Sequence, residues 1–200
     1  MKEAVMISIK PKWCQLIASG KKTIEIRKTK PKLETPFKVY IYCTKPSKKH
    51  QTVFGCRVLN DDELFRLPNG KIKYGDSIEM MAYDNYTADN FLNGKIIGEF
   101  VCNKIYTIKP CGYDNRDIKL RIIDKQFYYK ELDYNFLNKC QLSYLDIEKY
   151  SNGSNVYGWK ISDLVIYDKP KELSKFSRQY SSKKISLKRP PQSWCYVNEY

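Results

Sequence analysis

Histidine is almost missing from this chain of 200 residues, which contains one, His50, in the polar run KPSKKHQT. A metal site built from histidines is therefore excluded. A catalytic Ser-His or Cys-His pair would have to use this single residue, and no nucleophile stands out beside it in the sequence. We therefore predict a protein without a bound metal and without a cofactor.

No pair of cysteines has the spacing CxxC, and the number of cysteines is odd. Both features argue against a disulfide framework and against a zinc site, so reduced and mostly buried thiols are expected. The seven cysteines are residues 14, 43, 56, 102, 111, 140 and 195.

Long apolar runs are also lacking. None approaches the roughly 20 residues that cross a bilayer, and the N-terminus has no charged segment followed by an apolar one, as a signal peptide would. Together with the reduced thiols, this predicts a soluble, cytoplasmic protein with no membrane partner.

Positive charge is plentiful and unevenly placed. The formal net charge is +14, and residues 1–50 hold 13 Lys and Arg against 3 Asp and Glu, whereas residues 51–100 hold 5 against 8. A lysine-rich solvated surface would give the same total with no partner at all. The concentration in the first quarter favours a partner with phosphate groups, such as nucleic acid.

The first thirty residues predict a strand, a helix and a second strand. AVMISI is a short apolar strand, and Pro11 suits the first position of the helix that follows. Trp13, Leu16 and Ile17 fall on one face of that helix, and Gly20 suits the left-handed residue after its last turn. KTIEIRKT then alternates as a strand.

Further strands are expected at 37–44, 52–59 and 94–108, with antiparallel pairing. Asn69-Gly70 predicts a hairpin turn, and Gly98 predicts a bulge or bend. Residues 129–153 predict the second helical region, with a capping box at Ser143 and Asp146 and an end at Asn152-Gly153. A final pair of strands, a basic loop over 175–189 and an aromatic end docked on the body complete the chain.

These elements predict an α+β fold, a mixed β-barrel of about five to seven strands with two main helices. We expect one domain over residues 1–170 with a hairpin insertion at about 60–93, and a basic C-terminal extension over 171–200.

The stretch SGKKTIEIRKTKP sets one carboxylate, Glu25, among five positive charges. Strand alternation places Glu25 and Arg27 on one face, and Lys22 can reach either face. A carboxylate between two cations accepts hydrogen bonds from both and fixes their orientation. The alternative is that Glu25 forms an exposed ion pair that contributes little to stability. For an isolated E-x-R pattern, this alternative would be the better interpretation.

Gly20, Lys22, Glu25 and Arg27 follow the short helix in the pattern G-x-K-x-x-E-x-R, which resembles the signature of the ASCH domain family. NGKIIGEFVCNKI resembles a later strand of that family. YGWKISDLVIYDKPKEL and RPPQSWCYV are similar to the C-terminal part of ASCH proteins from phages and prophages. The resemblance implies a β-barrel of the PUA-like superfamily in which the motif lines a cleft for RNA or a nucleotide.

Carried over to this chain, Lys22 and Arg27 would contact phosphate or a base edge, Glu25 would orient them or read an amine, and Gly20 would allow a sharp turn. Bases are commonly held by aromatic stacking, for which Trp13 is a candidate, whereas Trp159 is expected in the core and Trp194 in the docked end. The expected nucleotide-binding residues are Lys10, Lys12, Trp13, Gly20, Lys22, Glu25 and Arg27.

Two other functions stay open. Some ASCH relatives are amidohydrolases that deacetylate N4-acetylcytidine, and others are proposed to cut RNA. A hydrolase of either kind would use Lys22 and Glu25, although the resemblance calls for a hydroxyl residue where Glu25 stands. A phage-encoded protein-interaction module is the other alternative.

Overall fold

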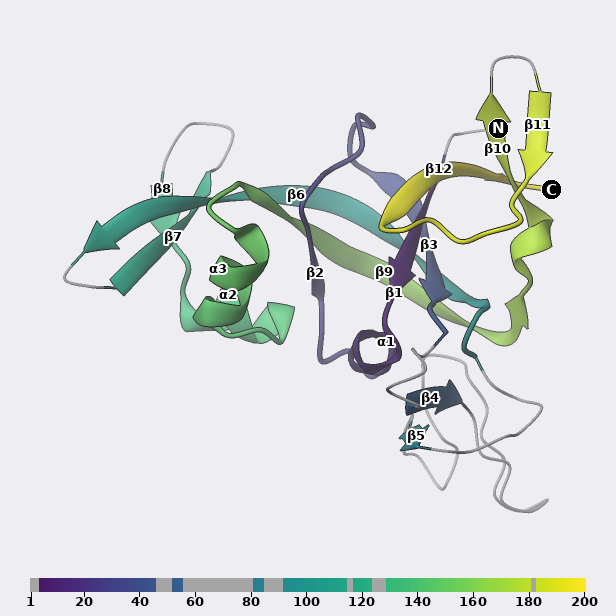
Figure 1. Ribbon diagram of the computed structural model, residues 1–200, viewed down its shortest axis with the longest axis horizontal. Coiled ribbons are helices and arrows are strands. Elements are labelled where there is room, and N and C mark those ends of the chain that lie inside the picture. The colour runs from purple at the N-terminus through teal and green to yellow at the C-terminus, as the bar shows by residue number, and fades with distance from the viewer. Residues whose placement is uncertain are drawn as a thin grey trace. The chain divides into compact units, whose positions relative to one another are not determined.

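The computed structural model describes residues 4–45, 52–55, 81–84, 92–114, 117–123, 129–180 and 183–200. Its strands are β1 (Ala4–Ile9), β2 (Ile24–Arg27), β3 (Phe37–Cys43), β4 (Thr52–Gly55), β5 (Met81–Asp84), β6 (Ile96–Asp114), β7 (Asp117–Ile123), β8 (Tyr129–Glu131), β9 (Val156–Lys171), β10 (Phe176–Tyr180), β11 (Lys183–Ser186) and β12 (Trp194–Glu199). Its helices are α1 (Pro11–Ala18), α2 (Tyr134–Cys140), α3 (Tyr144–Ser151) and the 3-10 turn η1 (Leu173–Lys175). Figure 1 shows these elements along the chain.

The chain divides into two compact units. Unit 1 consists of Met1–Gly20, Phe37–Val101 and Asp163–Tyr200, and unit 2 consists of Lys21–Pro36 and Cys102–Ser162. Strands β6 and β9 each contribute residues to both units. The predicted motif is therefore divided, because Gly20 belongs to unit 1 whereas Lys22, Glu25 and Arg27 belong to unit 2.

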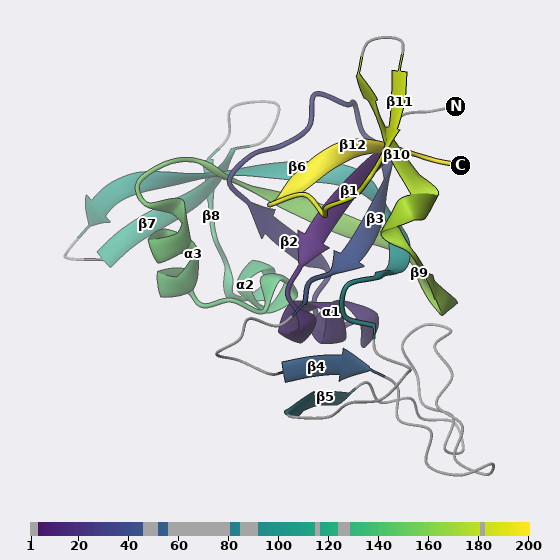
Figure 2. The ribbon, with the colours of Figure 1, turned by 45° about the vertical axis from the view of Figure 1, so that its right-hand side comes forward.

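In unit 1, β1 lies between two partners from distant parts of the chain. It pairs with β3 in parallel and with β12 in antiparallel fashion, as Figure 2 shows. The strands β11-β10-β12-β1-β3-β6 follow one another in the larger sheet, and β4 and β5 form a separate two-stranded sheet. The expectation of purely antiparallel pairing is thus wrong: β1 and β3 are linked through α1 and β2, and a connection of that length permits a parallel pair.

Helix α1 begins and ends as predicted. Pro11 occupies its first turn, the Gly20 amide donates to the Ile17 carbonyl, and Gly20 has a φ of +74°. The buried face differs from the prediction, because Cys14 and Ile17 are buried whereas Trp13 is only partly buried.

Gly98 of β6 lies against the backbone of β9. A Cβ atom at this position would lie 2.3 Å from the carbonyl oxygen of Val165. Close backbone approach therefore accounts for this glycine, because any side chain would push the two strands apart.

The core of unit 1 gathers side chains from β1, β3, β10 and β12. Tyr40 and Phe176 pack edge to face, with ring centroids 4.8 Å apart. Met6 and Phe176 are fully buried beside them. The end of the chain thus supplies core residues as well as a strand.

In unit 2, β2 pairs with β9, and β6, β7 and β8 form an antiparallel set. Ile24 and Ile26 of β2 pack with Phe136 of α2 and Ile147 of α3, which confirms the predicted apolar face of β2. Gly158 of β9 lies opposite Ile26, and a Cβ there would meet Phe136 at 3.3 Å. Because Gly158 has no side chain, α2 can approach β2 and β9 closely.

The second helical region contains two helices rather than one. Gln141 adopts a left-handed conformation with φ of 53° and ends α2, and the predicted capping box of Ser143 and Asp146 then begins α3. Asn152 ends α3 as predicted, with φ of 48°. Tyr129–Glu131, expected at the start of this region, forms β8 instead.

Two further expectations for the C-terminal part are wrong. The predicted final pair of strands is one long strand, β9, which passes through Asp163 at a φ of 49°. The predicted basic loop over 175–189 contains the antiparallel pair of β10 and β11. Cross-strand hydrogen bonds and the burial of Phe176 stabilise this polar segment. Composition alone does not predict either interaction, so the segment was expected to be a loop.

The fold is α+β with a mixed sheet, as predicted, but twelve strands are present among the described residues instead of five to seven. Their main hydrogen-bonded order runs from β11 to β8 without joining these two ends, so the predicted closed barrel is not confirmed. The Asn69-Gly70 hairpin and most of the expected insertion at 60–93 lie outside the described residues. No described helix has the length and apolar character of a membrane span.

Candidate functional site

The three charged motif residues of unit 2 form one cluster. Glu25 Oε1 lies 3.1 Å from Arg27 Nη2, and Glu25 Oε2 lies 3.4 Å from Lys22 Nζ. The exposed fractions of the side chains are 2% for Lys22, 7% for Glu25 and 13% for Arg27. The alternative of an exposed ion pair is therefore wrong, because this cluster is removed from water.

The backbone around Lys22 explains how the cluster is held. The Lys22 ammonium donates to the carbonyl oxygen of Cys140 at the end of α2. The Thr23 amide donates to the Lys139 carbonyl at 2.9 Å, and the Ile161 amide donates to the Thr23 carbonyl at 2.9 Å. Lys22 thus satisfies a carbonyl at a helix end, where a cation is favourable.

The cluster holds two cations and one carboxylate. Glu25 Oε2 accepts no hydrogen bond among the described residues, although the Lys22 ammonium is within ion-pair distance. Burying charges costs free energy unless each is well paired, so the stability of the buried cations depends on the shared carboxylate.

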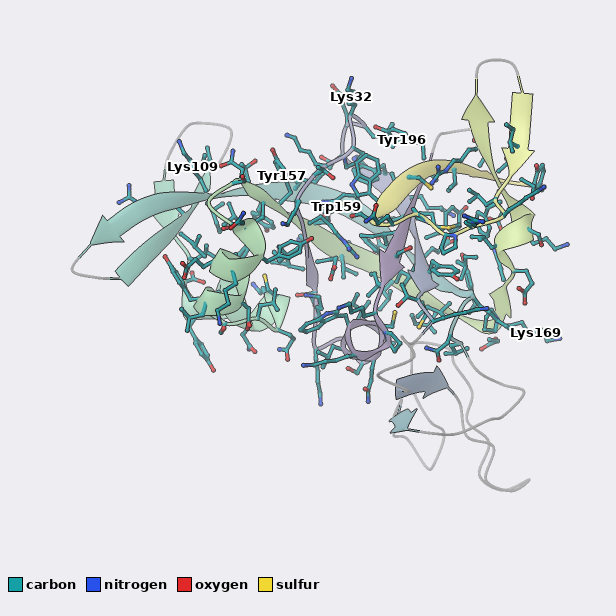
Figure 3. All side chains as sticks on the ribbon, in the orientation of Figure 1. Lys32, Lys109, Tyr157, Trp159, Lys169 and Tyr196 are labelled. Carbon is teal, nitrogen blue, oxygen red and sulfur yellow. The ribbon has the colours of Figure 1, made fainter. Side chains whose placement is uncertain are left out.

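Aromatic side chains of β9 lie on the same face as this cluster. Trp159 is directly opposite Glu25, and Tyr157 is directly opposite Arg27. Residues opposite one another in an antiparallel pair share a face of the sheet. Trp159 is fully buried, as predicted, whereas Tyr157 is partly exposed; Figure 3 labels both on β9.

Two lysines that follow β2 lie over tyrosine rings. Lys30 Nζ lies 5.5 Å from the centroid of the Tyr157 ring, and Lys28 Nζ lies 5.2 Å from the centroid of the Tyr150 ring. Both lysines are exposed. This part of unit 2 therefore offers partly exposed aromatic faces with cations held over them.

Cys140 has no features of a nucleophile. Burial raises the pKa of its thiol to about 12, an effect that Lys22 partly opposes. The thiol is thus protonated at neutral pH and acts as a small packed side chain. Free, buried cysteines are Cys14, Cys43, Cys102, Cys140 and Cys195.

The remaining predicted site residues belong to unit 1. Lys10 precedes α1, and its carbonyl accepts hydrogen bonds from the Trp13 and Cys14 amides. Lys12 is exposed, and its Nζ lies 4.9 Å from the centroid of the Trp13 ring. Trp13 itself is partly exposed, and a residue that stacks on a base needs an accessible ring.

Sequence reasoning missed a polar network in unit 1. Glu99 accepts hydrogen bonds from Lys38 at 2.7 Å and from Tyr167. Glu199 accepts from Tyr40 at 3.0 Å and from Lys171. These residues are spread over four strands, so no local pattern in the sequence could have grouped them.

The network changes the protonation behaviour of its members. Burial raises the pKa of Glu99, but the hydrogen bonds from Lys38 and Tyr167 outweigh it, so the pKa lies below its ordinary value. Burial and the hydrogen bond to Glu99 raise the pKa of Tyr167. Carboxylate and phenol thus stay in their ordinary charge states at neutral pH.

No group of three or more His, Cys, Asp or Glu side chains in the described ranges is placed to hold a metal ion.

The chain matches the family model of the ASCH domain over residues 7–184. It therefore belongs to the ASCH domain family, whose members are in general nucleic-acid-binding domains. No curated protein matches the chain.

Solved structures of one bacterial protein are similar to this chain. ASCH from Zymomonas mobilis is 15% identical, with a TM-score of 0.45 over 98% of this chain and 87% of that chain. Two point mutants of the Zymomonas mobilis protein also match over 98% of this chain. One is 16% identical with a TM-score of 0.45 over 91% of its own chain, and the other is 15% identical with a TM-score of 0.42 over 88% of its own chain.

Proposed function

We propose that this protein binds single-stranded RNA or a modified nucleotide through the motif cluster and the aromatic surface beside it in unit 2. The observation that carries the proposal is the burial of two cations on one carboxylate. A phosphate that approaches Arg27 would be attracted by its guanidinium in a region of low dielectric constant, where the attraction between opposite charges is strong.

The three motif residues have different tasks in this proposal. Lys22 is almost fully buried and donates to the Cys140 carbonyl, which fixes its ammonium group. The fixed ammonium in turn holds the Glu25 carboxylate through the ion pair. Glu25 then holds the Arg27 guanidinium in one orientation. Arg27 is the most exposed of the three, and its planar fork suits a phosphate or the edge of a base.

Tyr157 supplies the face on which a base can stack. It lies opposite Arg27 and is partly exposed, so one nucleotide can place its phosphate at Arg27 and its base on the ring. Stacking on aromatic side chains is the usual way in which single-stranded RNA is held. In unit 1, the exposed Lys10 and Lys12 and the partly exposed Trp13 are proposed to add further contacts, and Gly20 to provide the turn before the motif.

The geometry favours binding over hydrolysis. A hydrolase would need Lys22 to reach the substrate, but its side chain is 2% exposed and its ammonium donates to a backbone carbonyl. Glu25 occupies the position of the hydroxyl residue and is itself ion-paired. The free thiols suit a reducing compartment, so we also propose a cytoplasmic location.

Fluorescence anisotropy with a labelled oligouridine strand tests the proposal. Arg27→Ala should weaken binding about tenfold, since a charged hydrogen bond is worth about 1.5–3 kcal/mol. Lys160→Ala is the matched control, because Lys160 of β9 is exposed and lies opposite Ile24, on the other face of the sheet from Arg27. We expect less than a threefold change in the control.

Arg27→Lys keeps the charge and loses the fork, so it should bind with an intermediate affinity. Melting curves for all variants establish that they are folded. Equal affinities for the wild type, Arg27→Ala and Lys160→Ala would exclude the motif as the binding site.

A further inference from the structure

The β10–β11 hairpin of unit 1 carries a second concentration of positive charge. Residues 175–189 contain six Lys and Arg and no Asp or Glu. In the hairpin, Arg178 lies directly opposite Ile185, and the Leu187 amide donates to the Phe176 carbonyl at 2.8 Å. Arg178 therefore shares a face with apolar side chains.

A hollow of about 300 Å³ lies at this hairpin. Its lining contains three cations, one hydroxyl group and two aliphatic side chains, and no carboxylate. The lining residues are Arg178, Ile185, Ser186, Leu187, Lys188 and Arg189.

The hollow combines buried side chains with exposed cations. Leu187 is buried in the core of unit 1, and Arg178 is partly buried beside Cys195 of β12, whose thiol it contacts by a hydrogen bond. Lys188 and Arg189 are exposed. An arginine fork on an apolar wall with two exposed cations nearby is a suitable arrangement for a tetrahedral anion.

We propose that this hollow binds a phosphate group of an RNA backbone, a contact that rests on the RNA binding proposed above and extends it to unit 1. Arg178 provides the oriented donors, and Lys188 and Arg189 neutralise charge. Leu187, which is buried, supplies an apolar wall on one side, which strengthens the attraction. A contact to phosphate alone carries no sequence information, so it should not depend on RNA sequence.

Charge reversal at the exposed positions tests this site without disturbing the core. The variants are Lys188→Glu, Arg189→Glu and the double variant, with Lys169→Glu as the control. Lys169 is an exposed lysine of unit 1 outside the lining, and Figure 3 labels it. The probe is labelled oligouridine, measured by anisotropy at several salt concentrations.

The double variant should bind at least tenfold more weakly. It should also reduce the slope of log affinity against log salt by about 0.7, because the hollow binds one phosphate and each phosphate contact to a single strand contributes about 0.7. Lys169→Glu should change affinity less than threefold. Arg178→Lys, which retains the charge, should also weaken binding, whereas hairpin variants that behave like Lys169→Glu would overturn the site.

The same titrations separate this site from the motif. Loss of binding in Arg27→Ala with no loss in the hairpin variants would overturn the hairpin site alone. Loss in the hairpin variants with no loss in Arg27→Ala would support the hairpin site and contradict the motif. Competition by uridine monophosphate that disappears in the double variant would identify a free nucleotide as the ligand and overturn the assignment to RNA backbone.

Discussion

Glu25 and Trp159 lie directly opposite one another in the antiparallel pair of β2 and β9, and both are buried. A carboxylate beside an indole has little access to water, so its ion pairs with Lys22 and Arg27 replace hydration. The same packing that stabilises the strands thus determines how firmly the motif is held.

Glu25→Gln should therefore destabilise the protein. The substitution leaves two cations buried without their shared carboxylate, and removing one partner of a buried ion pair costs about 3 kcal/mol. Urea denaturation followed by circular dichroism measures the loss. Glu34→Gln is the control, because Glu34 is exposed, and it should change the free energy of unfolding by no more than about 0.5 kcal/mol. Equal stabilities of the two variants would disprove this role of Glu25.

Tyr157→Ala should weaken the binding of single-stranded RNA about fivefold to a hundredfold, since stacking of one base contributes about 1–3 kcal/mol. Tyr157→Phe retains the ring and should bind like the wild type. Tyr134→Ala is the matched control, because Tyr134 is 84% exposed in the same unit and lies outside the motif cluster. Anisotropy titrations measure all three, and an unchanged affinity in Tyr157→Ala would remove the stacking role.

Gly98→Ala should lower the free energy of unfolding by about 3 kcal/mol, because the new methyl group meets a backbone carbonyl that cannot rotate away. Gly153→Ala provides the comparison. Gly153 has a φ of +77° with open space around it, so only backbone strain of about 1 kcal/mol is expected. Thermal and urea unfolding measure both variants. A larger loss in Gly153→Ala than in Gly98→Ala would contradict the close approach of β6 and β9.

Stability should fall in acid partly through Glu99. Its pKa in the folded protein lies below the ordinary 4.5, so protonation favours the unfolded chain. The stabilisation is complete above the unfolded pKa and is lost as the pH falls through the folded pKa. Urea unfolding between about pH 6 and about pH 3 should show a shallower decline for Glu99→Gln than for the wild type. The control variant Glu34→Gln should follow the wild type, and parallel curves for all three would refute this contribution.

Patterns of neighbouring residues in the sequence correctly predicted those parts of the fold that depend on interactions between neighbouring residues. The alternation of Ile24 and Ile26, the capping box of Ser143 and Asp146 and the turn at Gly20 are confirmed because each depends on residues close in sequence. The parallel pair of β1 and β3 and the network around Glu99 depend on residues brought together from distant segments, which one sequence does not reveal.

The candidate site shows the same division. The G-x-K-x-x-E-x-R spacing predicted that Lys22, Glu25 and Arg27 come together, and they do. The resemblance to the ASCH family implied a cleft lined by the motif, whereas Lys22 and Glu25 are buried. Their burial results from α2 and β9, which follow more than a hundred residues later. The hollow at the β10–β11 hairpin was missed because a polar, basic stretch resembles a loop until its cross-strand pairing is known.

The antiparallel pairing of β1 with β12 joins the first and the last of the described strands. During synthesis, β1 therefore acquires both neighbours only after residues 194–199 have emerged from the ribosome. Pairings of such high contact order form slowly, and until then β1 exposes an apolar edge. Molecular chaperones that shield nascent chains would have their greatest effect on this protein during that interval.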